Sequence, residues 1–479
     1  MSPTIWTSAK NFRKSSIYKR LMALCMANLI ACSLRVPGFA SQGVSGGPAP
    51  TLGSIEDVTN AIVKKELGLL NLDTKFRIAA ARKSKWKPWR MFLYQLLASG
   101  LTEAGMTIDV VAGWKYYRKP KLAPRDLLKA GPICNITAPS IALGGTLLEA
   151  ILDKLQDRRL RKSGLDRKSA LKCFLQLRAD NDRLLAERSQ LIKNASLSAI
   201  QRQVLEADGV VLKDIRDLAS RQFAEYYIQT RHSLAARDAG SLLAIVGAGT
   251  SGYLGSISTL LAVTERNPKL TGVGGIGYAT AGSIVMMTPI LTRLAGNLAS
   301  KSSERKMQNM VYSNLEGMNR GIFEADRQKL LAILDKADSS DLVLMKGLNA
   351  RISAYQLHKT IFDNQKAIAV RHAERRNSEL KEDLLFSGIV GGTSIARGSL
   401  MMEAGFNYSR DPSKLFKLGA IASTIYMVGA GAWLYDTLQD RIRADIRDRK
   451  AKIAQSSTQN QLQQRLQSIE EMEDTVSLY

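Results

Sequence analysis

Four ionisable side chains lie inside stretches that are otherwise apolar. Glu103 and Asp109 fall within residues 91–113, and Arg397 and Glu403 fall within residues 384–406. A single charge left unpaired in hydrocarbon costs roughly 3 kcal/mol or more. Charged residues in such places therefore tend to pair with one another or to line a path for ions or protons. They are the candidate intramembrane polar site of this chain.

An internal repeat brings two of these charges to equivalent positions. The repeat is carried by two residue types in constant register, 144 residues apart: Pro124, Pro268 and Pro412, and then Gly131, Gly275 and Gly419. In this frame Asp109 falls on Arg397, with Tyr253 between them in the second copy. We expect Asp109 and Arg397 to form an ion pair inside a helical bundle. Such a pair would either line a solute or proton path or be structural, and shallow spans would instead let both groups reach the interface.

Each repeated proline lies between two long apolar segments. The segments pair as 91–113 with 130–150, 240–263 with 271–292, and 384–406 with 415–435. Residues 240–263 hold 24 positions without a charge, and a helix of that length covers about 36 Å, enough for a hydrocarbon core of roughly 30 Å. The sequence predicts an all-α polytopic membrane protein, with three repeated transmembrane hairpins and about six helices.

Two long polar stretches separate the hairpins. Residues 153–237 and 297–383 are rich in charged residues, Leu, Ala and Gln, and contain no Pro. In the first stretch, leucines recur at near-helical spacing: Leu171, Leu175, Leu177, Leu184, Leu185 and Leu191. We predict that both stretches form long amphipathic helices, folded as helical hairpins or coiled coils.

The predicted organisation has eight parts. They are a targeting or signal segment (1–40), a linker with a short basic amphipathic region (41–90), hairpin 1 (91–152), helical insertion 1 (153–237), hairpin 2 (238–296), helical insertion 2 (297–383), hairpin 3 (384–436) and a charged helical tail (437–479). Residues 1–55 contain no acidic residue, and basic residues precede the apolar run 21–34. This order is typical of a secretory signal. A transit peptide and a lipoprotein signal with Cys32 as the lipidated residue are the alternatives.

Small residues recur along one face of two of the apolar segments. Gly247, Ser251 and Gly255 lie four residues apart, as do Gly388 and Gly392. Such spacing lets two helices approach closely in lipid, where packing replaces the hydrophobic effect. These five residues are the predicted helix-packing positions.

Gly247 also begins a GxGxxG pattern at residues 247–252, which in a dinucleotide-binding fold cradles a pyrophosphate between strand and helix. Only Tyr253–Thr264 separates Gly252 from the next acid, too little for a helix and a second strand. The three histidines have no second ligand at metal spacing, and the cysteines form no CxxC pair. We therefore predict no cofactor, metal or catalytic residue, and a protein that is not an enzyme.

The formal net charge of +25 indicates anionic partners. The sequence shows no nucleic-acid motif, so we predict the lipid bilayer and its anionic headgroups rather than nucleic acid. The predicted location is a bacterial inner membrane or an organelle membrane, entered through the N-terminal targeting sequence. The predicted function is a structural, scaffold or assembly role, with protein partners bound through the helical insertions. The alternative is a solute or ion transporter with a path on a pseudo-threefold axis. The oligomeric state stays open.

Overall fold

The computed structural model describes residues 51–81, 86–312, 320–335, 342–453 and 458–477. These residues are almost entirely helical and contain no strand, so the all-α prediction is confirmed for the described part of the chain. The elements are α3 (Leu52–Ala81), α4 (Lys87–Tyr116), η2 (Pro120–Leu122), α5 (Arg125–Lys162), α6 (Arg167–Asn194), α7 (Ala199–Gly249), η3 (Thr250–Ile257), α8 (Ser258–Thr264), α9 (Lys269–Met310), α10 (Arg320–Leu334), α11 (Leu342–Met402), η5 (Glu403–Asn407), α12 (Pro412–Ile453) and α13 (Thr458–Ser477). The targeting segment 1–40 and the start of the linker lie outside the described residues.

Five helical stretches are long and apolar enough to cross a membrane. They lie within Arg125–Asn194, Ala199–Thr264, Lys269–Met310, Leu380–Asn407 and Pro412–Lys450. The prediction was about six, and α4 is not among these five. Its apolar segment carries the two carboxylates Glu103 and Asp109, which oppose transfer of the helix into lipid.

The three repeated prolines all mark the start of a helix. Pro124 directly precedes α5, Pro268 directly precedes α9, and Pro412 is the first residue of α12. Proline suits these places because it has no backbone N–H to leave unsatisfied in the first turn. Each of the three prolines therefore lies where a short connecting segment ends and an apolar helix begins.

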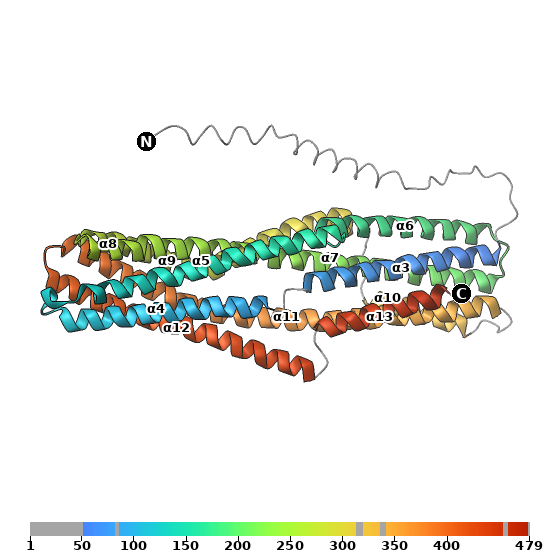
Figure 1. Ribbon diagram of the computed structural model, residues 1–479. Helices are drawn as coiled ribbons and strands as arrows, with labels where there is room; N and C mark the ends of the chain where they lie inside the picture. Colours follow the sequence, from blue (N-terminus) through green and yellow to red (C-terminus); the bar gives the residue numbers. More distant parts are fainter. Residues whose placement is uncertain (1–50, 82–85, 313–319, 336–341, 454–457, 478–479) are drawn as a thin grey trace, which may run out of the picture. The chain divides into compact units, whose positions relative to one another are not determined.

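The apolar segments pack as a closed ring, which we call the apolar bundle. It comprises α4, α5 to residue 152, residues 238–264 of α7, η3 and α8, α9 to residue 296, α11 from residue 384 with η5, and α12 to residue 436. Helix α4 contacts α5 and α12; α5 contacts η3, which contacts α9; and α9 contacts α11, which contacts α12. Figure 1 shows α4 and α12 lying side by side.

The remaining helices form a second part, the polar domain. It comprises α3, α6, α10, α13 and the adjoining parts of α7, α9 and α11. Two apolar clusters fill it: one centred on Ile62, Leu67 and Leu212, the other on Phe174 and Phe223, whose rings stack with centroids 4.1 Å apart. The polar domain therefore has its own apolar cores, separate from the packing of the apolar bundle.

Four of the predicted parts contribute to the polar domain: the linker region, both helical insertions and the charged tail. The region expected to be a linker with a short basic amphipathic region contains the 30-residue helix α3, whose Ile55, Ile62 and Leu67 are fully buried. The insertions are helical and pack with α3 into shared cores. In the tail, α13 folds back against α3, where Arg465 pairs with Asp73 at 2.9 Å.

Candidate functional site: a polar cluster inside the apolar bundle

The predicted ion pair forms inside the apolar bundle. Arg397 on α11 and Asp109 on α4 approach to 3.8 Å between Nη2 and Oδ2. The Arg397 side chain is 3% exposed and the Asp109 side chain 21% exposed. Asp109 and Arg397 are 288 residues apart, which is two lengths of the repeat. Helix α12 contacts both α4 and α11. The pair therefore ties together two helices that each pack against a third.

Each of the six ring segments contributes to a cluster around this pair. Asn135 on α5 donates from Nδ2 to Asp109 at 3.3 Å. Ser256 in η3 donates to the Asn135 carbonyl at 3.0 Å, and its hydroxyl lies 2.9 Å from that of Tyr278 on α9. The ring of Tyr426 on α12 lies 5.1 Å from the Arg397 guanidinium. We call these six side chains the polar cluster: Asp109, Asn135, Ser256, Tyr278, Arg397 and Tyr426.

Aromatic rings, more than hydrogen bonds, surround the guanidinium. Arg397 lies over the Tyr278 ring at 3.9 Å, closer than its distance to the Tyr426 ring. A cation held over aromatic faces gains electrostatic stabilisation that grows when water is removed. The Nε atom of Arg397 is buried without a hydrogen-bond partner in the described structure. The charge is thus balanced by one carboxylate at longer than hydrogen-bond distance and by two rings.

Glycines provide the space that the cluster occupies. A Cβ on Gly131 would lie 1.9 Å from Asp109 Oδ1, and a Cβ on Gly105 would lie 2.6 Å from Asn135 Oδ1. The first of the repeated glycines is therefore required by the carboxylate. Its counterpart Gly275 makes a different close contact, with the Gly398 carbonyl, whereas a Cβ on Gly419 would meet nothing within 4 Å.

The other predicted polar residues lie outside this cluster. Glu103 is half-buried, and its Oε2 atom has no hydrogen-bond partner in the described structure. Glu403 is exposed in η5 and accepts a hydrogen bond from Asn407 at 2.8 Å. Tyr253, which the repeat places between Asp109 and Arg397, is 57% exposed. The structure brings together two of the four charged candidates.

Four members of the cluster were missed by the sequence reasoning. Asn135, Ser256, Tyr278 and Tyr426 are uncharged, so they do not interrupt an apolar segment as a charge does. Ser256 lies in η3, a π-helical turn, and such turns are frequent at functional sites. A search of the apolar segments for hydrogen-bonding side chains, and not only for charges, would have found all four.

The predicted small-residue positions divide into two groups. A Cβ on Gly255 would lie 2.7 Å from the Tyr278 ring, and one on Gly247 would make an ordinary contact with Ile284 at 3.6 Å. Ser251 donates within its own helix, to the Ala248 carbonyl. Gly388 and Gly392 make no close helix contact within the described chain, because a Cβ on either would meet nothing within 4 Å.

The close face of α11 lies beside the predicted one. A Cβ on Gly391 would lie 2.6 Å from the Gly282 carbonyl, and one on Gly398 would lie 2.5 Å from the Gly275 carbonyl. These glycines lie seven residues apart on each of the two antiparallel helices, so α9 and α11 meet backbone to backbone over two turns. Residues on one face of a helix recur at intervals of both three and four residues. The four-residue spacing of Gly388 and Gly392 therefore indicated the row next to the one that packs against α9, which contains Gly391 and Gly398.

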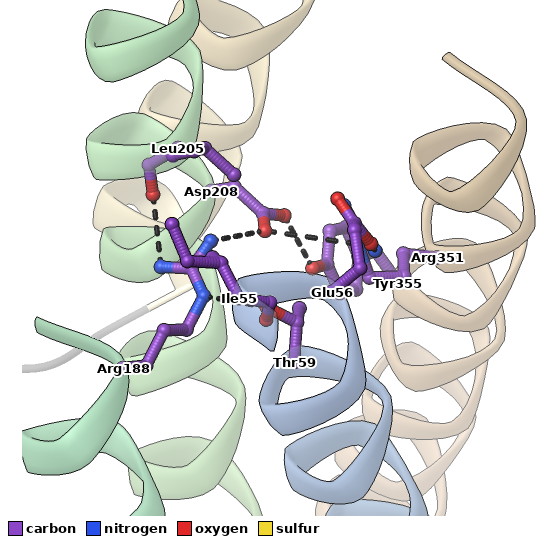
Figure 2. A network of polar contacts seen from close by, with 8 residues as sticks. All are labelled: Ile55, Glu56, Thr59, Arg188, Leu205, Asp208, Arg351 and Tyr355. Atoms are coloured by element: carbon purple, nitrogen blue, oxygen red, sulfur yellow. Dashed lines mark hydrogen bonds and ion pairs between the residues drawn. The ribbon is translucent and has the colours of Figure 1, made fainter. Parts of the chain in front are cut away.

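A second set of buried charges lies in the polar domain (Figure 2). Arg188 on α6 donates to Asp208 at 2.8 Å, to the Leu205 carbonyl at 2.9 Å and to Thr59 at 2.8 Å. Arg351 on α11 donates to Glu56, and its Nε lies 3.7 Å from Asp208. We call Glu56, Thr59, Arg188, Asp208, Arg351 and Tyr355 the domain network.

The domain network is electrically balanced and hydrogen-bonded across four helices. Its two guanidinium groups face two carboxylates, and Tyr355 donates to Asp208 Oδ1 at 2.7 Å. Burial and the negative Asp208 raise the pKa of the Tyr355 hydroxyl well above its ordinary value, which keeps the proton on the donor. The network joins α3, α6, α7 and α11, so its arrangement suits a structural role.

Two further features bear on cofactors and metals. The GxGxxG residues 247–252 lie within α7 and η3, and among the described residues no strand precedes them. His358 is buried, and burial with the nearby Arg465 lowers its pKa to about 3, which keeps the imidazole neutral. Among the described residues, no group of three or more His, Cys, Asp or Glu side chains is placed to hold a metal ion.

Comparison with known proteins returned no match, either to protein-family models, to curated proteins or to solved structures.

Proposed function

We propose that this chain is an integral membrane protein with a structural or assembly role, in which the apolar bundle spans the bilayer and positions the polar domain beside it. The observation that carries this proposal is the continuity of three helices. Helices α7, α9 and α11 each run from the core of the polar domain into the apolar bundle. A helix that is packed at both ends holds the two parts in a defined relation.

In this proposal the six apolar segments form three hairpins around a pseudo-threefold axis. The closed ring of helix contacts and the equivalent places of the three prolines support this arrangement. We include α4 as the sixth span because Asp109 pairs with Arg397 and accepts a hydrogen bond from Asn135 instead of facing lipid alone. The targeting segment would deliver the chain to a bacterial inner membrane or an organelle membrane.

The proposed topology places the whole polar domain on one side of the membrane. Protease added outside sealed vesicles should therefore cleave both 153–237 and 297–383, or neither of them. The chain should also stay with the membrane after carbonate extraction. Cleavage in one stretch but not the other would contradict the three-hairpin arrangement, and release by carbonate would contradict membrane integration altogether.

A structural role further predicts a stable assembly and no transport. The chain purified from its native membrane in mild detergent should have a defined mass above that of the monomer, and the assembly should be lost when Asp208→Ala disrupts the domain network. Purified chain in sealed proteoliposomes should carry no proton or ion flux above that of empty vesicles. A monomer that conducts would contradict the proposal.

A second candidate, transport along the bundle axis, is favoured by the polar cluster. Six segments each place one polar side chain at a common place, and the Asp109–Arg397 contact is longer than a hydrogen bond. If this cluster lines a path, Asp109→Asn and Arg397→Gln should each abolish flux in proteoliposomes. Glu403→Gln is the matched control, because Glu403 is exposed and outside the cluster.

A further inference from the structure

The three links that join the apolar helices in pairs differ strongly in charge. Over the same fifteen positions of the repeat frame, residues 115–129 carry six basic residues and one acidic residue. Residues 259–273 carry two basic and one acidic residue, and residues 403–417 carry three basic and two acidic residues. The links occupy equivalent places in the repeat. If positive charge were needed everywhere at this end of the bundle, all three links would carry similar numbers of basic residues. The excess of basic residues on the first link therefore indicates a function of that link.

Packing brings the most basic link against the third link. Ser413 at the start of α12 donates to the Tyr117 carbonyl at 2.8 Å, and η2 contacts α12. One helical turn before Tyr117, a Cβ on Gly113 of α4 would lie 2.7 Å from the Cβ of Ala420 on α12. Exposed basic side chains from both links therefore share one surface, which we call the basic platform: Lys115, Arg118, Lys119, Lys121, Arg125, Lys414 and Lys417.

Apolar and aromatic side chains accompany these charges. Leu122 is 66% exposed between Lys121 and Arg125, and Trp114 is 44% exposed while its Nε1 donates to Thr424 at 3.2 Å. Tyr117 accepts a hydrogen bond from Arg118 at 2.6 Å. Trp and Tyr prefer the level of the lipid headgroups, where one end of the ring meets hydrocarbon and the other meets water. This set of residues matches the chemistry of that layer.

We propose that the basic platform binds the phosphate groups of anionic phospholipids. The proposal rests on the membrane location proposed above. Lysine and arginine beside an anionic leaflet are attracted to it individually, and several of them on one surface act together. Leu122 would enter the acyl boundary while the ammonium groups contact phosphate, and the contacts between η2 and α12 hold both sets of charges in place before lipid binds.

The test uses the full chain and a variant that removes three charges. Arg118→Gln, Lys119→Gln and Lys121→Gln are combined, and native mass spectrometry of the detergent-solubilised protein counts bound phosphatidylglycerol against phosphatidylcholine. The matched control combines Arg158→Gln, Arg159→Gln and Arg161→Gln, three exposed residues at the other end of α5 with the same charge. We expect the first variant to lose its preference for phosphatidylglycerol at least about fivefold and the control to keep it.

Two outcomes would overturn the proposal. An equal loss in the control variant would show that net charge and not the platform selects the lipid. Full displacement of phosphatidylglycerol by inorganic phosphate would show that the surface binds a free anion. Carbonate extraction of the same variants distinguishes failure of the lipid-site proposal from failure of the proposed function. A wild-type chain that stays in the membrane but shows no preference for phosphatidylglycerol would contradict only the lipid site.

Discussion

The polar cluster and the domain network both neutralise buried arginines, but they do so in different ways. In the domain network Arg188 makes three hydrogen bonds of 2.8–2.9 Å, one of them to a carboxylate. In the polar cluster Arg397 has one carboxylate at 3.8 Å and the faces of two tyrosines. Both arginines are at most 3% exposed.

The difference follows from what each region has available. The polar domain has many polar side chains that can converge on a guanidinium, and Arg188 also donates to the Leu205 carbonyl within α7. Within the apolar bundle polar side chains are few, so the partners of Arg397 are the Asp109 carboxylate and two tyrosine rings. The domain network therefore holds its charges with several directed hydrogen bonds, whereas the polar cluster holds Arg397 with fewer directed contacts.

The largest expected effect is on the domain network. Asp208→Ala leaves Arg188 and Arg351 buried without the carboxylate that lies between them, so we expect about 3–5 kcal/mol of lost stability. Thermal unfolding of the detergent-solubilised chain measures it. The control is Asp180→Asn, which breaks a half-exposed pair with Lys65 and should cost less than about 1 kcal/mol. Equal effects of the two variants would show that the domain network stabilises the fold no more than a half-exposed ion pair does.

The next effect concerns the polar cluster. Asp109→Leu leaves Arg397 as a lone charge, which should cost roughly 3 kcal/mol. Arg397→Leu should cost less, because a lone carboxylate can be neutralised by a proton and a guanidinium cannot. The double variant should be more stable than Asp109→Leu alone. Denaturation by sodium dodecyl sulfate titration measures all three, and strictly additive losses would contradict a direct pair.

Close helix packing within the bundle gives a third prediction. Gly398→Ala places a methyl group 2.5 Å from backbone atoms of Gly275 and Ala279, so we expect about 1–3 kcal/mol of destabilisation from overpacking. Gly392→Ala is the control on the same helix, where the methyl group meets nothing within 4 Å and should be neutral or stabilising. The same denaturant titration measures both. Reversal of this order would contradict the packing face described here.

The smallest effect is a pH dependence in the polar domain. Burial, and then the negative Asp326 and Asp217, raise the pKa of Asp214 to about 7. The unfolded chain has a value near ~4, so the folded state holds a proton that the unfolded state releases. Stability should therefore fall as the pH rises from about 4 to about 7.

Asp214→Asn should remove this pH dependence and stabilise the chain at about pH 8. We expect roughly 1–2 kcal/mol, because water penetration and relaxation reduce the nominal cost of a buried charge. Thermal unfolding across this pH range measures it, with the exposed Asp238→Asn as the control. An unchanged pH profile in Asp214→Asn would show that Asp214 is ionised in the folded chain.

The repeat predicted two of the six members of the polar cluster. The spacing of Pro124, Pro268 and Pro412 located three helix starts, and the same frame matched Asp109 with Arg397 before any contact was known. It could not indicate that Tyr278 would lie over the guanidinium, because the register between α9 and α11 depends on which glycines meet. For the same reason the pattern of Gly388 and Gly392 selected a neighbouring row on α11.

The sequence by itself determined that the described chain is helical, where its apolar segments begin, and which opposite charges lie 288 residues apart in those segments. These properties are local or periodic, since they follow from hydropathy, proline and spacing along one helix. Only the tertiary structure decided that residues 52–81 and the two polar stretches share one core, and that four further side chains gather around the pair of Asp109 and Arg397. Those contacts depend on how helices far apart in the chain rotate and slide against one another, and that is set by the packing of side chains on both partners together.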